Sequence, residues 1–297
     1  AGGDGLDFRS DLGTLNLYAT TTVNMGTGFL DFRAPHSINV LSGTATINGR
    51  IGLPSGDITV DVPLNTTLQV NATITGGFGF NKSGVGMMYL NAANTYSGPT
   101  VVQAGWLRLQ NGSALGSSAS GTVVSNLASL VFDGAFGVTN ESLTLNGFGV
   151  GSGWGALDSE AGGNAFWTGP ITLNADSTIT PFGGGSVLHL TGVISGPGGL
   201  IVGTQTGSGS GSLYFDGASA NTYAGDTSVR GGTLFLNKGV FDGSIPHNLI
   251  IGNGSGADTV RLLQQNQIPN TALVTINLGG VLDLNNQAWA ANTTLMV

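Results

Sequence analysis

Apolar and polar residues alternate along almost the whole chain, in runs of only three to five residues. Typical runs are Ile58-Thr59-Val60-Asp61-Val62, Leu143-Thr144-Leu145 and Leu188-His189-Leu190. Such alternation places apolar side chains on one face of a strand and polar side chains on the other. Gly, Asn, Ser or Pro bounds each run, as turns require. No longer window shows the period of a helix, so the pattern predicts an all-β fold of very short strands.

One stretch of the chain occurs twice. Residues 94–109 return as residues 221–236, with nine of the sixteen positions identical. Internal repetition of this kind indicates that the chain is built from stacked structural units. We interpret the shared residues as structural, because they recur at fixed positions and would hold neighbouring units in register. They include Asn94, Tyr96, Gly98, Gly105, Leu107 and Leu109 in the first copy, and Asn221, Tyr223, Gly225, Gly232, Leu234 and Leu236 in the second.

Three architectures could use such short strands. A β-sandwich would need longer strands with hairpin signals, and a propeller would repeat every ~40–50 residues. An elongated right-handed parallel β-helix (β-solenoid) needs what the sequence offers, namely short strands, an apolar inward face and a turn at each corner. We therefore predict one β-helix segment over residues 1–297. Residues 1–39 would form weaker N-terminal coils and residues 40–297 the repeat-containing coils, and we expect the segment to be part of a longer protein.

The two copies resemble the autotransporter-associated β-strand repeat, the passenger-associated repeat of large bacterial surface proteins. The surrounding phrases at residues 192–200 and 258–262 are similar to that family as well. The resemblance covers about residues 40–297 and is a marker of the β-helix rather than of one function. It implies a secreted or surface-displayed stalk, at an extracellular location or on the bacterial cell surface.

The composition excludes several classes of function. The net charge is −8, only 8% of residues are charged and no basic run is present, which argues against nucleic-acid binding. The chain has no cysteine, so disulfides, thiolate metal sites and a cysteine nucleophile are excluded. No apolar run approaches the ~20 residues that span a bilayer. We therefore expect no membrane insertion by this segment.

Catalytic chemistry has little support in the sequence. The nearest pair of carboxylates on one strand face is Asp57 and Asp61. A polysaccharide-cleaving β-helix would need acids and bases clustered on one face. His189 is predicted to point outward between two leucines, as an ordinary surface histidine. We predict that the segment is not an enzyme. The three histidines lie far apart and in no metal-ligand spacing: His36, His189 and His247.

Two local features suggest binding. Residues 2–7 resemble a single unit of the calcium-binding nonapeptide repeat, so Asp4 and Asp7 are the only calcium candidates, and we expect no other cofactor. Trp154 lies in a glycine-rich stretch that is typical of a loop, and Trp167 follows it within residues 148–168. These two tryptophans are our candidates for a binding loop, because aromatic rings at the surface can stack on ligands.

The preferred function is therefore structural. The chain would act as a stalk, fibre or matrix subunit that associates with itself or with neighbouring repeats through open coil edges. The alternative is an adhesin segment that binds surface glycans or a host surface through the loops that do not repeat.

Overall fold

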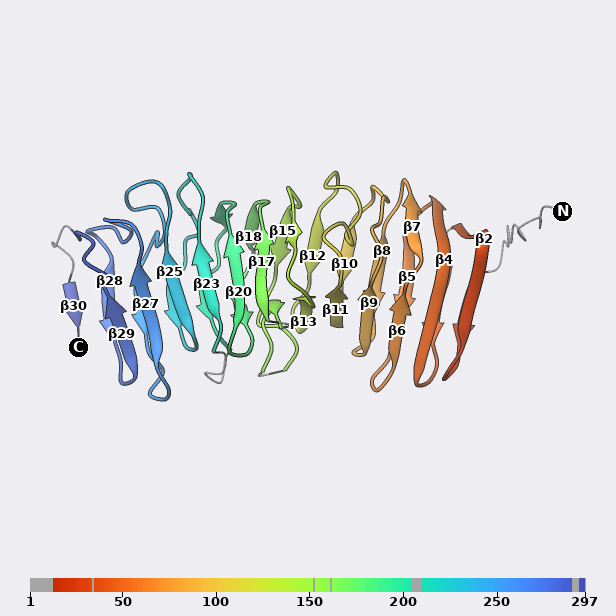
Figure 1. Ribbon diagram of the computed structural model, residues 1–297, viewed down its shortest axis with the longest axis horizontal. Helices are drawn as coiled ribbons and strands as arrows, with labels where there is room; N and C mark the ends of the chain where they lie inside the picture. Colours follow the sequence, from red (N-terminus) through yellow and green to blue (C-terminus); the bar gives the residue numbers. More distant parts are fainter. Residues whose placement is uncertain are drawn as a thin grey trace. The chain divides into compact units, whose positions relative to one another are not determined.

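The computed structural model describes residues 13–33, 35–151, 153–160, 162–204, 210–289 and 294–296. The chain divides into two compact units, Ala1–Leu130 and Val131–Val297. Each unit is a parallel β-solenoid, whose successive coils place short strands side by side in the same direction (Figure 1). The described residues contain no helix, and so none that could cross a membrane. The predicted all-β parallel fold is confirmed. The right-handed turn and the single 1–297 segment stay predictions.

The N-terminal unit contains strands of two parallel sheets. In the first sheet the neighbours, in order, are β1 (Thr14–Leu17), β3 (Ser37–Val40), β5 (Ile58–Asp61), β8 (Phe80–Ser83), β10 (Thr100–Val102) and β12 (Thr122–Val124). In the second they are β2 (Thr22–Arg33), β4 (Thr44–Ser55), β6 (Thr67–Val70), β9 (Met87–Leu90) and β11 (Gly105–Leu109), while β7 (Thr73–Gly76) pairs with the second half of β4. Strand β13 (Ala128–Phe132) contains the boundary between the units.

The C-terminal unit contains strands of three parallel sheets. One has β15 (Leu143–Leu145), β18 (Ile171–Leu173) and β21 (Ile194–Ser195). Another has β16 (Leu157–Ser159), β19 (Ser177–Pro181), β22 (Leu200–Val202), β24 (Thr227–Val229), β26 (Leu249–Ile251), β28 (Leu273–Ile276) and β30 (Thr294–Met296). The third has β14 (Gly137–Val138), β17 (Gly163–Trp167), β20 (Ser186–Leu190), β23 (Ser212–Phe215), β25 (Thr233–Leu236), β27 (Asp258–Leu262) and β29 (Gly280–Asp283).

The register of these strands stacks apolar side chains into buried columns. Leu68, Met88 and Leu107 are register partners on β6, β9 and β11, and each is at most 2% exposed. In the C-terminal unit Leu213 and Leu234 form an equivalent pair on β23 and β25. Burying one such side chain contributes about 1.5–3 kcal/mol. Stability is then roughly a sum over neighbouring coils, as in other solenoids.

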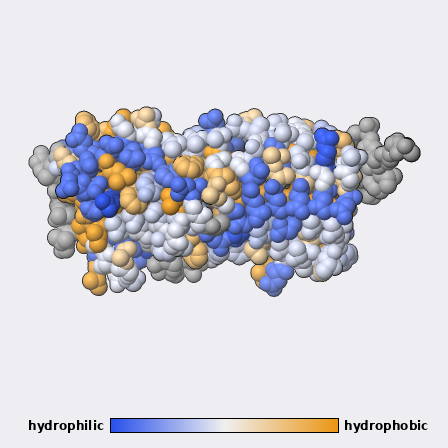
Figure 2. Space-filling model, viewed as in Figure 1, coloured by the Kyte–Doolittle hydropathy of each residue, from blue (hydrophilic) through white to orange (hydrophobic). Residues whose placement is uncertain are grey.

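Polar side chains form ladders on the outside. Asn48, Asn71 and Asn91 each donate from Nδ2 to the Oδ1 of the asparagine one coil earlier, over 2.5–2.8 Å, and the first acceptor is Asn24. Such a ladder satisfies amide groups while it holds adjacent coils in register. Figure 2 shows hydrophilic residues gathered in a band over the N-terminal unit on the face that it draws. The abundance of asparagine therefore serves stacking.

Lys82 lies in the core of the N-terminal unit. It occupies β8 between the register partners Val60 and Val102 and is fully buried. Its Nζ donates to the backbone carbonyls of Gly84 (2.6 Å) and Ala104 (2.9 Å), which lie at the corner of successive coils. Burial lowers the pKa of Lys82 from 10.5 to about 7, against a smaller opposite effect of nearby Asp61.

This buried amine predicts a pH dependence of stability. Between about pH 7 and pH 10 the unfolded chain binds a proton at Lys82 that the folded chain does not. Stability should therefore rise with pH across this window, by up to about 1.4 kcal/mol per pH unit. Urea unfolding at several pH values, with Lys82→Met as reference, checks this. The difference in unfolding free energy between the two proteins should grow in favour of the parent as pH rises. Parallel pH profiles would contradict the prediction.

Candidate ligand-binding groove

The inward residues of the two repeat copies make the same contacts. Oδ1 of Asn94 accepts from the backbone nitrogen of Ile74, one coil earlier, and its Nδ2 donates to the carbonyl of Ala114, one coil later. Asn221 bridges Ile194 and Ser244 in the same way. Both asparagines are 3% exposed. Each therefore ties three successive coils together.

A buried hydroxyl pair is also common to both copies. Tyr96 and Thr100 share a hydrogen bond of 2.5 Å between their hydroxyl oxygens, and Tyr223 and Thr227 share one of 2.6 Å. Burial raises the pKa of the Tyr223 phenol above its ordinary value, so this hydroxyl stays protonated. The tyrosines fill the core at the corner of the coil, and they are not available to a ligand.

The copies differ where their side chains face outward. The first strand is β10 in one copy and β24 in the other. Its inward residues are a threonine and a valine in both copies, whereas the residues that alternate with them on the outward side differ. The outward residues are Pro99, Val101 and Gln103 in the first copy, and Asp226, Ser228 and Arg230 in the second. The second copy thus has an acid, a hydroxyl and a base in line on the outer side of the strand, on a backbone that the first copy shares, although Ser228 is only 7% exposed.

Around β24 these outward residues lie in a shallow groove of the C-terminal unit. Ser228 is the register partner of Ile201 on β22 and of Ile250 on β26. A serine between two isoleucines leaves a depression in the outer face of the sheet. Two hollows of about 410 and 420 Å³ meet here, and both are lined by Ser228, Arg230 and Ile250. Together they form the groove, which extends across the coils from β22 to the end of β28.

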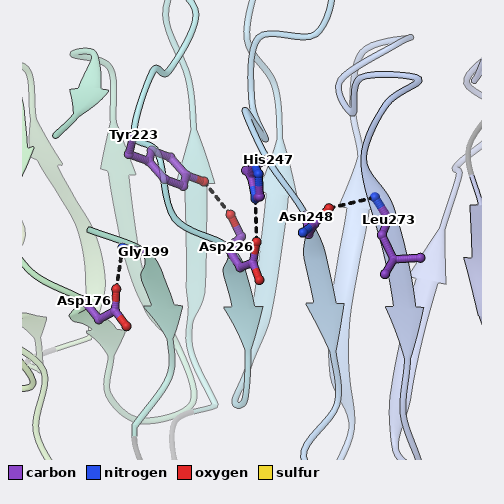
Figure 3. Close-up of polar contacts among 8 residues, drawn as sticks. Asp176, Gly199, Tyr223, Asp226, His247, Asn248 and Leu273 are labelled. Atoms are coloured by element: carbon purple, nitrogen blue, oxygen red, sulfur yellow. Dashed lines mark hydrogen bonds and ion pairs between the residues drawn. The ribbon is translucent and has the colours of Figure 1, made fainter. Parts of the chain in front are cut away.

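Acidic groups and a histidine line one side of the groove (Figure 3). Asp226 Oδ1 lies 2.6 Å from His247 Nδ1, and both side chains are about half exposed. Asp176 Oδ1 accepts from the backbone nitrogen of Gly199 over 2.7 Å. At the same corner Asn248 Oδ1 accepts from the backbone nitrogen of Leu273. These side chains are held in place by the coils on either side, with further oxygen and nitrogen atoms facing solvent.

The opposite side of the groove carries Arg230 and amide groups. Arg230 Nε donates to Ser228 Oγ over 3.0 Å. Asn253 Nδ2 donates to the Arg230 carbonyl over 2.8 Å, and its Oδ1 accepts from both the backbone nitrogen and the hydroxyl of Ser255. Asn277 Nδ2 donates to the carbonyl of Gly252. The groove can therefore offer charged and neutral hydrogen-bonding groups on a rigid sheet, an arrangement that suits a hydroxyl-rich ligand.

Comparison with known proteins relates the repeat to one family. Residues 80–109 and 204–234 match the passenger-associated-transport-repeat model. The chain carries two passenger-associated transport repeats. A stretch of 114 residues, 38% of the chain, is 33% identical to the adhesin BmaC autotransporter of Brucella suis biovar 1 (strain 1330). The chain spans only 3% of that protein's length. No solved structure matches. The resemblance to the passenger-associated repeat is confirmed, and the groove lies partly on the second passenger repeat.

The two tryptophans predicted to form a binding loop do not share a site. Trp167 is fully buried and packs edge to face against Phe132, so its prediction as a binding residue is wrong. The reason is that Trp167 is part of strand β17, in which side chains alternate between the two faces. Ala165 and Trp167 face the core, and Phe166 faces outward. Trp154 is partly exposed and stacks on Phe182, with ring centroids 5.4 Å apart. It stays a candidate and is not among the residues that line the groove.

His189 is part of an aromatic ladder on the third sheet of the C-terminal unit. Its ring stacks between Phe166 and Tyr214, with centroids 4.7 and 4.4 Å away, and Tyr214 stacks in turn on Phe235. His189 Nδ1 lies 2.6 Å from Asp216 Oδ2. The outward direction predicted for His189 is correct, and its role is in stacking between coils.

The carboxylates Asp57 and Asp61 bind the next coil. Asp57 accepts from the backbone nitrogen of Gly79, and Asp61 accepts from the Ser83 hydroxyl. Within the described residues no group of three or more histidine and carboxylate side chains could hold a metal ion. The calcium candidates Asp4 and Asp7 lie outside the described residues.

Proposed function

We propose that this segment belongs to the surface-displayed passenger of a bacterial autotransporter adhesin, and that the groove around Ser228 binds glycans of another surface. The passenger repeats and the similarity to an adhesin support the location and the class of protein. One observation carries the assignment to the groove. The second repeat keeps the inward residues of the first and replaces its outward residues by Asp226, Ser228 and Arg230. The stacking of coils depends on the inward residues and does not require this change of outward residues. Recognition of a ligand depends on the outward residues.

The structural role inferred from the sequence stands as a second candidate. The buried columns and the asparagine ladder join each coil to the next, which suits a stalk that holds a binding surface away from the cell. A stalk and an adhesive groove are compatible in one segment. The similarity to an adhesin favours the binding function as the one to test first.

A glycan array tests the proposed function. We expect the purified chain to bind a restricted set of glycans, and the double variant Ser228→Val with Asn253→Ala to lose at least ~90% of that binding. Valine is the residue of the first repeat at the position of Ser228, so the backbone should tolerate it. A tenfold loss corresponds to about 1.4 kcal/mol, which a few hydrogen bonds readily supply.

The matched control is Val101→Ser, the reverse exchange in the first repeat, which should bind as the parent does. Retention of the glycan signal by the groove variant would contradict the assignment. Loss of the signal in Trp154→Ala alone would place the ligand at that loop instead. Adhesion of beads coated with the chain to cultured cells gives the corresponding functional readout.

A further inference from the structure

The basic side chains in the described part of the chain are nearly all committed to other contacts. Lys82, Lys238 and Arg108 are buried. The guanidinium of Arg50 lies over the Phe29 ring, 3.9 Å from its centroid, and Arg261 is paired with Asp283 and Asn285. Arg230 is different, because it lies partly exposed in the groove and its side chain bonds to a neutral serine hydroxyl.

The neighbouring coils leave space on both sides of Arg230. From the register of β22, β24 and β26, the residues beside it are Gly203 and Gly252. Both glycines have positive φ, +93° and +97°, a conformation that side chains with a Cβ rarely adopt. Neither of these two residues therefore has a side chain beside the Arg230 backbone, while the guanidinium itself folds back toward Ser228, which Ile201 and Ile250 flank. Nε is held by Ser228, which leaves the Nη groups for a partner.

A carboxylate is the group that such an arginine recognises best. The planar guanidinium donates two parallel hydrogen bonds to the two oxygens of a carboxylate, and these bonds are about twice as strong as neutral ones. We propose that Arg230 anchors the carboxylate of an acidic glycan, one that contains uronic or sialic acid, in the groove. This inference rests on the proposed function, and it names the class of glycan.

The acids at the other side of the groove do not prevent this. Asp226 and Arg230 both line the first hollow, and the side chain of Arg230 folds back along β24 to Ser228, so its guanidinium lies nearer to Asp226 than the four-residue spacing of their backbones. The Asp226 carboxylate is about half exposed, so solvent and salt screen its charge. Asp226 is moreover next to His247, 2.6 Å away, which takes part of its hydrogen-bonding capacity. Repulsion between these carboxylates and a bound one should therefore be small compared with the contact at Arg230.

The rest of the groove favours a glycan over an acidic peptide. Beyond Arg230 it offers the amides and hydroxyl of Asn253, Ser255 and Asn277, which suit sugar hydroxyl groups. No phenylalanine, tyrosine or tryptophan side chain that could anchor a peptide is among the described lining residues, and the apolar ones are Leu200, Ile201 and Ile250. Successive coils lie about 4.8 Å apart, similar to the length of one pyranose. A linear glycan along the stack could then meet equivalent positions on successive coils.

Binding of matched acidic and neutral glycans tests the inference. The probes are hyaluronan hexasaccharide against chitohexaose, and sialyllactose against lactose, measured by calorimetry with the full chain. We expect at least one acidic probe to bind at least tenfold tighter than its neutral partner, with an affinity that falls as salt rises. Arg230→Gln, which installs the residue of the first repeat, should remove this preference. Arg261→Gln, on another face, should keep it.

Three outcomes overturn the inference. These are equal binding of acidic and neutral probes, a preference that persists in Arg230→Gln, and equally tight binding of polyglutamate, which would point to an acidic protein as partner. If the neutral probes bind and the Ser228→Val with Asn253→Ala variant abolishes this, the groove is still a glycan site and only the carboxylate assignment fails. If no probe binds and bead adhesion is unaffected by the groove variant, the proposed function fails as well.

Discussion

Replacement of Gly98 by alanine is expected to lower the free energy of unfolding by about 3 kcal/mol or more, the upper part of the range for overpacked interiors. A Cβ at Gly98 would lie 2.1 Å from the backbone nitrogen of Gly79 and 2.3 Å from the backbone carbon of Phe78, in the coil before. No side-chain movement can relieve a clash between a Cβ and backbone. The coils would have to separate locally, and separation breaks the hydrogen bonds that stack them.

Thermal and urea unfolding followed by circular dichroism measure this loss. Because each coil contacts only its neighbours, hydrogen exchange should show lost protection concentrated around residues 78–99. Gly77→Ala is the matched control, since a Cβ there would meet no atom within 4 Å. Its unfolding free energy should stay within about 0.5 kcal/mol of the parent. Equal stability of the two variants would mean that the corner is less tightly packed than the structure indicates.

The fold could be predicted because its rules are local. Alternation alone identifies Val102 and Val229 as inward residues, and both are fully buried. Repetition indicates that Gly105 lies at a turn between two strands of the coil. Its φ of +67° explains why a glycine recurs at the same position, Gly232, in the second copy. In a solenoid each coil has the same environment as the next. A short pattern therefore determines a large part of the architecture, and no long-range pairing has to be guessed.

The groove could not be predicted in the same way, because it depends on the register between coils of unequal length. Ile201 and Ser228 are 27 residues apart, while Ser228 and Ile250 are 22 apart, yet all three are register partners. Insertions between strands hide such neighbours from a sequence reading. One signal was available, namely the outward positions at which the two repeat copies differ. Comparing the copies for their differences, as well as for their identities, would have singled out Asp226, Ser228 and Arg230.

The buried polar residues were missed for a different reason. Lys82 follows the alternation as an inward residue, but its charge argues for an outward position in any reading of the sequence. It is tolerated because corner carbonyls of two coils accept its hydrogen bonds. The sequence also did not show which of Phe166 and Trp167 faces inward, since two adjacent aromatic residues fit the alternation equally well in either direction. In both cases tertiary partners decide what periodicity leaves open.

Replacement of Asn221 by alanine is expected to cost about 2–5 kcal/mol of unfolding free energy. The change removes partners from the backbone nitrogen of Ile194 and from the carbonyl of Ser244, which lie in the coils before and after. Each backbone group left unsatisfied in the interior costs about 1–3 kcal/mol. Urea unfolding measures the loss. Asn174→Ala is the control, because this residue is exposed and its side chain bonds to another surface amide, Asn146, so the change should alter stability by about 0.5 kcal/mol or less.

A second substitution at this position tests the mechanism as well as the magnitude. Asn221→Asp keeps the size of the side chain and the oxygen that accepts from Ile194, but it places a carboxylate oxygen against the Ser244 carbonyl. Burial and this repulsion should raise the pKa of the new carboxyl group in the folded state. Stability should then recover as pH falls through that pKa, because the protonated acid can donate to the carbonyl as the amide did. If the variant stays equally unstable at every pH, the loss comes from packing, and the bridge between coils is not the reason that this asparagine recurs.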